Sequence, residues 1–329
     1  MGNKKKKLYQ YKVIKNWKEL LEFYQNTFTD EKESWVFRGD NPDHEDEDTS
    51  HIPENAFRSR LEKDFCRFGI EDTDKRLCIE QKLIREFRRK AQLHTNHRQE
   101  NWLECLGLMQ HYEGPTRMLD WTYSFFAAVY FATNGAKVKF NDEKKYDHRV
   151  VWALDNDWLH NRNEKYEYEF IRKTFASDDT NLEHPKNVWP KVFKSEESAE
   201  FYRKNYKNDF DNIMIHHLIK TNKDSLVYAV SPYYLNERLS IQRGVLICPS
   251  RIDISWGKNL ECMLEKERKG KYHLWRIRIE WKKVEVQKEI LRRLFDMNIS
   301  QASLFPDLDG LAKSLRIRIA MPETLGIRK

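Results

Sequence analysis

The chain has 329 residues, of which 40% are hydrophobic and 13% aromatic, so it is long enough to bury a sizeable core. Lysine and arginine together number 59 and aspartate and glutamate 52, which leaves a net charge of +7. This small and dispersed excess does not by itself indicate a nucleic-acid-binding protein. No run approaches the roughly 18 apolar residues of a membrane helix, and the start lacks the apolar stretch of a signal peptide. We therefore expect a globular, cytoplasmic protein with no part in the membrane.

The potential metal ligands and thiols do not form a motif. The five cysteines are an odd number without metal-type spacing, which is typical of reduced thiols in a reducing compartment. His94 and His97, and the pair His216 and His217, have no cysteine or carboxylate companions at ligand spacing. We expect no metal site.

The first third of the chain predicts strands and amphipathic helices in alternation. Apolar residues recur at i, i+3, i+4 and i+7 in the first helix, which predicts a buried face. Gly114-Pro115 ends a later helix that begins near Trp102. The expected elements are a short strand and a helix within 8–27, a strand at 34–40, a helix at 75–93 and the helix that begins near 102.

The stretch "TRMLDWTYSFFAAVYFA" predicts a buried strand followed by a buried helix. Residues 116–122 have the length of a strand. Ser124 is a helix-capping residue, and the helix that follows is apolar on both faces until Gly135. A helix that is apolar all round belongs inside the protein.

The remainder of the chain returns to strands after a polar interruption. Residues 156–222 are charged and rich in Asn and Lys, with scattered aromatics, and they predict a helical insertion. Strand patterns then resume. The expected elements are strands at 149–155, 225–232, 244–250 and 272–281, a helix at 284–297 and a short helix after "FPDLDG".

An arginine and a glycine follow the apolar half of the strand "SWVFRGD". A guanidinium at the end of a strand can reach a phosphate or a carboxylate. The adjacent Gly39 lets a ligand approach the backbone closely. The alternative is that Arg38 makes an ordinary surface ion pair.

These motifs resemble the FRG domain family, which is named after the triplet found here as Phe37-Arg38-Gly39. The chain also carries "LMQHYEGPTRMLDWTYSFFAAVYFA", "NERLSIQRGVLI" and "LFPDLDGLAKSL", in the order of the family's blocks. The four blocks span about residues 35–315. One departure is Glu113, which stands where the family usually has Gly. The resemblance implies a single FRG-type domain over residues 1–329, with 156–222 as an insertion.

A second and weaker resemblance is to the ADP-ribosyltransferase superfamily of the arginine type. In that superfamily a first strand carries Arg-Gly, a second strand leads through Ser or Thr into a helix, and a third carries Glu or Gln. "FRG", "LDWTYS" and "SIQRG" are similar in order. The resemblance implies an α+β fold in which a split, mostly antiparallel sheet with flanking helices forms a cleft. Tyr130 is not aligned with the tyrosine of the poly-ADP-ribose polymerases, because residues 124–134 predict a helix.

The resemblance also implies a ligand and a site. The ligand would be NAD or a related nucleotide, bound without a Gly-rich phosphate loop, since no such motif is present. Arg38 would hold a phosphate, Gly39 would pair with a carboxamide and Trp121 would offer a stacking face. The implied catalytic residues are Arg38, Asp120 and Gln242, and the implied ligand-binding residues are Arg38, Gly39, His111, Arg117, Trp121 and Thr122.

Several roles stay open. Cleavage of the glycosidic bond needs a carboxylate near an oxocarbenium-like centre, and Gln242 carries no charge. Asp120, Glu113 or Glu237 would then supply it. Asp120 is either catalytic or a buried partner of Arg117 or Arg38. His111 is either a general base or an interior histidine with satisfied hydrogen bonds.

Three functions follow from these possibilities. The first is an ADP-ribosyltransferase-like enzyme, a toxin or defence effector that modifies an unknown macromolecule. The second is a non-catalytic module that binds a nucleotide or another phosphate ligand. The third is a nucleic-acid-binding protein that uses the basic residues of 85–90 and Lys4–Lys7.

Overall fold

The structure is a computed structural model of the whole chain. It describes residues 7–40, 48–94, 102–134, 147–175, 224–230, 237–267, 270–281 and 284–325. None of the helices in these ranges is long and apolar enough to cross a membrane.

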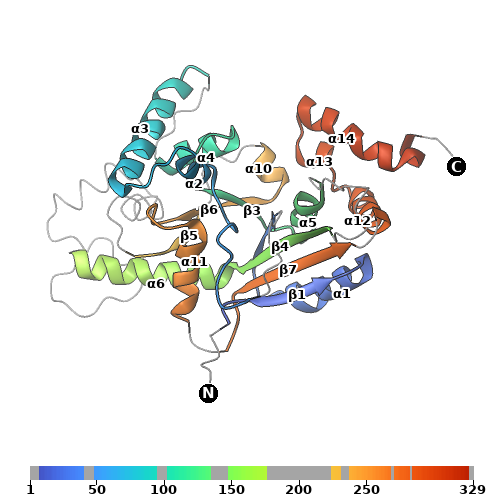
Figure 1. Cartoon of the computed structure of the whole chain (residues 1–329), viewed down its shortest axis with the longest axis horizontal. Coiled ribbons are helices and arrows are strands. Elements are labelled where there is room, and N and C mark those ends of the chain that lie inside the picture. Colours follow the sequence, from blue (N-terminus) through green and yellow to red (C-terminus); the bar gives the residue numbers. More distant parts are fainter. Residues whose placement is uncertain are drawn as a thin grey trace.

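One seven-stranded sheet organises the described chain (Figure 1). The strand order is β1-β7-β4-β2-β3-β6-β5, and all neighbours are antiparallel except β1 and β7. The predicted combination of a mostly antiparallel sheet with flanking helices is confirmed. The strands are β1 (Gln10–Ile14), β2 (Trp35–Asp40), β3 (Leu119–Thr122), β4 (Asp147–Asp155), β5 (Val227–Val230), β6 (Gly244–Pro249) and β7 (Leu274–Trp281).

Helices cover both faces of the sheet, because side chains of successive strand residues point to opposite sides. On β2, for example, Val36 belongs to one core, while Trp35 and Phe37 belong to the other. The first core is closed by α3 (Thr73–Ala91), α4 (Trp102–His111), α6 (Asn156–Phe175) and α11 (Trp256–Glu265). The second is closed by α1 (Trp17–Phe28), α5 (Phe125–Asn134), α12 (Val284–Asp296) and α13 (Gln301–Leu304).

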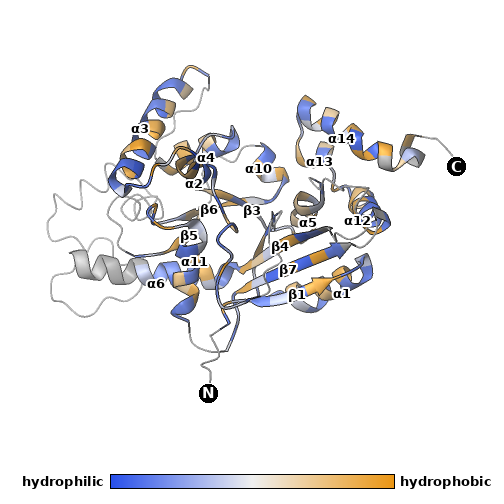
Figure 2. Ribbon diagram, viewed as in Figure 1, coloured by the Kyte–Doolittle hydropathy of each residue, from blue (hydrophilic) through white to orange (hydrophobic). Residues whose placement is uncertain are grey.

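Three further helices and a short turn complete the described chain. Figure 2 shows mixed hydrophilic and hydrophobic residues along the helix nearest the C-terminus, which lies at the edge of the view. The three helices and the turn are α2 (Arg60–Arg67), α10 (Glu237–Ile241), α14 (Leu308–Ala320) and a 3-10 turn at Pro322–Leu325.

The joint between β2 and β3 is the shortest in the sheet. Within the described chain the two strands pair at Phe37 and Thr122, whereas β2 pairs with β4 along its whole length. After this pair, β2 continues beside β4 and β3 continues beside β6. Backbone groups of Asp120 that face β2 are therefore available to a side chain.

The strand and helix predictions are largely confirmed. The predicted strands correspond to β1 to β7, and the buried helix beginning after Ser124 is α5, with the Ser124 hydroxyl accepting from the Ala127 amide. One prediction is wrong: "ERLSI" forms α10, so Gln242 follows a helix instead of lying within a third strand. The start of the predicted insertion 156–222 is the helix α6, and residues 176–222 lie outside the described residues.

Candidate functional site

Arg38 bridges the two strands where their backbone pairing ends. Its Nη1 donates to the carbonyl oxygen of Asp120 at 2.6 Å. The side chain is half-buried, and its Nε is buried without a hydrogen-bond partner among the described residues. The predicted proximity of Arg38 and Asp120 is therefore seen, but the guanidinium contacts the backbone of Asp120 instead of its carboxylate.

The carboxylate of Asp120 is exposed and is oriented by a buried glutamine. Gln110, at the end of α4, donates from Nε2 to Asp120 Oδ2 at 2.7 Å. The amide oxygen of Gln110 accepts from Thr116, whose hydroxyl in turn accepts from the Met118 amide. This chain of hydrogen bonds sets the orientation of Gln110, so the glutamine donates to Asp120 and not the reverse.

His111 lies in the same region, next to a second arginine. Burial lowers the pKa of His111 below its usual value of 6.5, and the positive charge of Arg238 lowers it further. The charges of Asp120 and Asp307 oppose this shift without cancelling it. At neutral pH, His111 is therefore an uncharged imidazole that can accept a proton.

These five residues form what we call the Asp120 cluster: Arg38, Gln110, His111, Asp120 and Arg238. They come from β2, from the consecutive elements α4 and β3, and from α10, which are three separate regions of the sequence. Arg238 also stacks over Phe305, with its guanidinium carbon 4.4 Å from the ring centroid. The cluster thus combines two guanidinium groups, a neutral imidazole and one exposed carboxylate.

Gly39 is packed closely against α5. A Cβ at this position would lie 2.3 Å from the Ala128 carbonyl oxygen and 2.5 Å from the Ala132 amide nitrogen. The backbone of α5 therefore fills the space beside the glycine. The close approach that the sequence predicts is made by a helix of the same chain.

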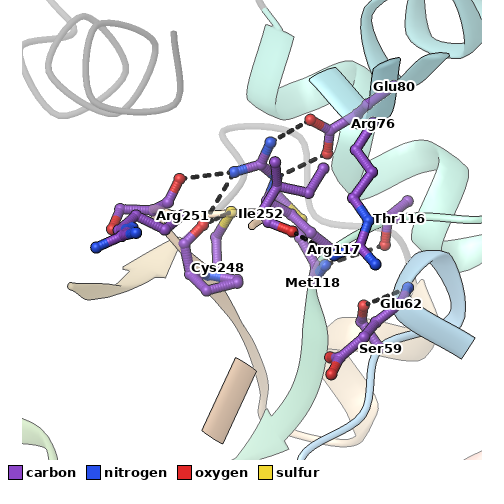
Figure 3. Close-up of polar contacts among 12 residues, drawn as sticks. Ser59, Glu62, Arg76, Glu80, Thr116, Arg117, Met118, Cys248, Arg251 and Ile252 are labelled. Atoms are coloured by element: carbon purple, nitrogen blue, oxygen red, sulfur yellow. Dashed lines mark hydrogen bonds and ion pairs between the residues drawn. The ribbon is translucent and has the colours of Figure 1, made fainter. Parts of the chain in front are cut away.

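Arg117 is not part of the cluster, which corrects the predicted convergence. It is 2% exposed, and its guanidinium forms a two-pronged ion pair with Glu80 of α3, which is 1% exposed (Figure 3). It also donates to the carbonyl of Ser250 at 2.8 Å. Burial alone would lower the pKa of Arg117, but the charge and hydrogen bonds of Glu80 raise it.

Trp121 and Thr122 are also used inside the protein. Trp121 is 2% exposed, and its ring packs against those of Phe57 and Trp256, with ring centroids 5.6 and 6.4 Å away. It has no free face for a ligand. Thr122 donates to the Gln242 carbonyl at 2.6 Å and accepts from the Ser124 amide, so it joins β3 to the end of α10 and to the start of α5.

Gln242 holds the C-terminal helices in place. Its side chain is 9% exposed, and Nε2 donates to the Leu304 carbonyl at 3.0 Å. The amide is therefore engaged with the end of α13. The structure supports a connecting role for Gln242 and gives no contact to the Asp120 carboxylate.

The other two carboxylates considered for the charge are exposed. Glu237 lies in the first turn of α10, and Glu113 pairs with Arg60 at 3.6 Å. Glu113 has φ of 61°, a conformation that favours glycine. The family's usual Gly at this position is thereby explained: the chain leaves α4 through a left-handed residue, and Gly114 then donates to the Met109 carbonyl.

Sequence reasoning missed Gln110 and Arg238. Gln110 stands beside His111 in the quoted block, but its apolar neighbours in α4 gave no sign that it points at Asp120. Arg238 lies one turn before Gln242, on the same side of a short helix, and it was hidden by the expectation of a strand.

Comparisons with known proteins were made against family models, curated proteins and solved structures. No curated protein and no solved structure matches the chain. The model of the FRG domain matches residues 33–141, a range that includes four residues of the Asp120 cluster and excludes Arg238. The chain therefore contains an FRG domain.

Proposed function

We propose that the Asp120 cluster binds NAD or a related nucleotide with a diphosphate, and that the protein is an ADP-ribosyltransferase-like enzyme. The single observation that carries the proposal is the exposed carboxylate of Asp120, oriented by buried Gln110 beside the backbone contact of Arg38. Guanidinium groups suit phosphates because they offer paired donors. Arg38 lies beside Asp120, and the charge of Arg238 acts on the neighbouring His111.

The proposed reaction breaks the bond between nicotinamide and the ribose C1′. The electron pair of that bond leaves with nicotinamide, and positive charge develops on the ribose ring. Asp120 stabilises this charge, because a preorganised carboxylate does so without reorganisation. An acceptor group or water then attacks C1′ and loses a proton, for which the neutral imidazole of His111 is the available base.

The test measures nicotinamide release and labelling of candidate macromolecules when the protein is incubated with NAD labelled in its adenosine part. We expect Asp120→Asn to reduce release by about a hundredfold to a thousandfold, in line with the loss of one transition-state interaction. Asp296→Asn, which changes an exposed carboxylate of α12, is the matched control and should leave the rate unchanged.

If no nicotinamide is released, calorimetry with NAD and ADP-ribose distinguishes a protein that binds the nucleotide without cleaving it from one that does not bind it. Binding that Arg38→Ala abolishes, without nicotinamide release, would show a non-catalytic nucleotide-binding module. The absence of both binding and release would overturn the proposal. Arg38→Lys keeps the charge but loses the fork of donors, and we expect it to bind weakly.

A further inference from the structure

The helix α14 presents its large apolar residues to the surface. Four of them recur at intervals of three, four and four residues, which places them along one side of the helix. We call them the α14 stripe. They are Leu308, Leu311, Leu315 and Ile319, with exposed fractions of 80%, 53%, 54% and 82%.

Two small residues of α14 are the ones buried against the protein. Gly310 and Ser314 are buried, and a Cβ at Gly310 would lie 2.0 Å from the Phe305 carbonyl oxygen. An amphipathic helix at a protein surface normally turns its large apolar residues inward. In α14 most of the large apolar residues are exposed instead, and the close approach of Phe305 leaves no room for a side chain at Gly310. The α14 stripe is therefore a surface without a partner in the described chain.

The charges along α14 are arranged so that the helix is complementary to itself. Asp307 and Asp309 are at its N-terminal end, and Arg316 and Arg318 are at its C-terminal end. Between them, Lys313 forms an exposed ion pair with Asp309 within the helix. Asp309 and Arg316 are seven residues apart, so they lie on the same side of the α14 stripe. A two-fold axis across the helix brings the same side of two copies together, with the N-terminal end of one beside the C-terminal end of the other.

We propose that the α14 stripe is a dimer interface, in which α14 packs antiparallel against α14 of a second copy of this chain. With the two-fold axis near the middle of the helix, Leu308 faces Ile319 of the second copy. Leu311 faces Leu315, and Asp309 comes beside Arg316. Each contact occurs twice, as an isologous interface requires. The helix lies at the periphery of the fold, near the C-terminus, where a second copy can approach it (Figures 1 and 2).

Sedimentation equilibrium of the full chain over a concentration series tests the interface. We expect a monomer–dimer equilibrium, and we expect Leu311→Glu and Leu315→Glu each to raise the dissociation constant about tenfold or more, as for a central interface residue. Leu93→Glu is the matched control, since Leu93 is an 80% exposed leucine outside α14. It should leave the constant unchanged. Circular dichroism confirms that each variant is folded.

A charge exchange tests the antiparallel register. Asp309→Arg alone and Arg316→Asp alone should each weaken the dimer, because like charges then face each other. The two changes together should restore it. Each single change also places an unfavourable charge on the helix dipole. If the single changes weakened the dimer only by destabilising the helix, the two losses would add in the double variant and the dimer would not be restored.

Three results would overturn the proposal. A protein that is monomeric at its highest soluble concentration has no such interface. A dimer that survives Leu315→Glu uses another surface. A monomer that sediments with vesicles of phosphatidylserine and phosphatidylcholine, and loses this binding in Leu315→Glu, would show that the α14 stripe meets a membrane surface instead.

Discussion

Two arginines near β3, Arg117 and Arg38, lie in opposite environments. The contrast distinguishes a residue that stabilises the fold from a candidate for ligand binding. Arg117 is buried and its charge is matched by Glu80 in a two-pronged ion pair. Arg38 is half-buried and donates to a backbone carbonyl, a partner without a net charge. The charge of Arg117 is therefore compensated by a carboxylate inside the protein, whereas the backbone contact of Arg38 leaves its charge uncompensated.

The largest effect is expected where the buried pair is broken. Glu80→Ala leaves the guanidinium of Arg117 buried and uncompensated, and we expect a loss of about 3 to 5 kcal/mol in the free energy of unfolding. Urea denaturation measures it. Glu86→Ala removes an exposed carboxylate from the same helix and is the control. Equal curves for the two variants would show that the buried pair does not anchor α3.

A substitution of Gly39, the neighbour of Arg38, tests how tightly this region is packed. Gly39→Ala forces a Cβ against the backbone of α5, and we expect a loss of about 1 to 3 kcal/mol. Gly257→Ala is the matched control, because the nearest atom to its new Cβ is a side-chain methyl of Ile52 at 3.1 Å. The unfolding midpoints of both variants give the comparison. A fully stable Gly39→Ala protein would show that the space beside β2 opens readily, as a ligand site would.

Thiol reactivity probes the Arg117 region without a mutation. Burial raises the pKa of Cys248 to about 12; nearby Arg117 lowers it, but Glu80 opposes that effect. We expect Cys248 to react with a thiol reagent only after unfolding, whereas exposed Cys66 and Cys78 react in the native protein. Mass spectrometry identifies the modified residues. Rapid native labelling of Cys248 would contradict a tightly closed Arg117 region.

The smallest effect is a pH dependence in the Arg38 region. The pKa of His111 is lower in the folded chain than its usual 6.5, so below that pH the unfolded chain binds more protons. Stability should therefore fall as the pH drops through 6.5 and should not change above it on account of this group. When the urea midpoint is plotted against pH, His111→Gln should remove the part of the slope that comes from this histidine. An unchanged slope would show that His111 is not shielded in the folded protein.

Much of the site could be predicted because strands and helices leave local signals. The spacing of apolar residues predicted β2, β3 and α5, and these elements bring Arg38 near Asp120. The sequence could not show which face of a strand each polar residue would take. Arg117 and Trp121 each lie two residues from Leu119, so an extended backbone turns them to the side opposite Asp120. A shift of one residue would reverse every side chain.

The sequence by itself determined the order of elements, the family blocks and the presence of a polar stretch after an apolar strand, because these depend on residues close together in the chain. The tertiary structure decided that Glu80 neutralises Arg117, that α5 fills the space beside Gly39, that Gln110 donates to Asp120, and that Arg238 acts on His111. The physical reason is that the role of a buried charged group depends on the group that pairs with it, and that partner comes from a distant segment of the chain.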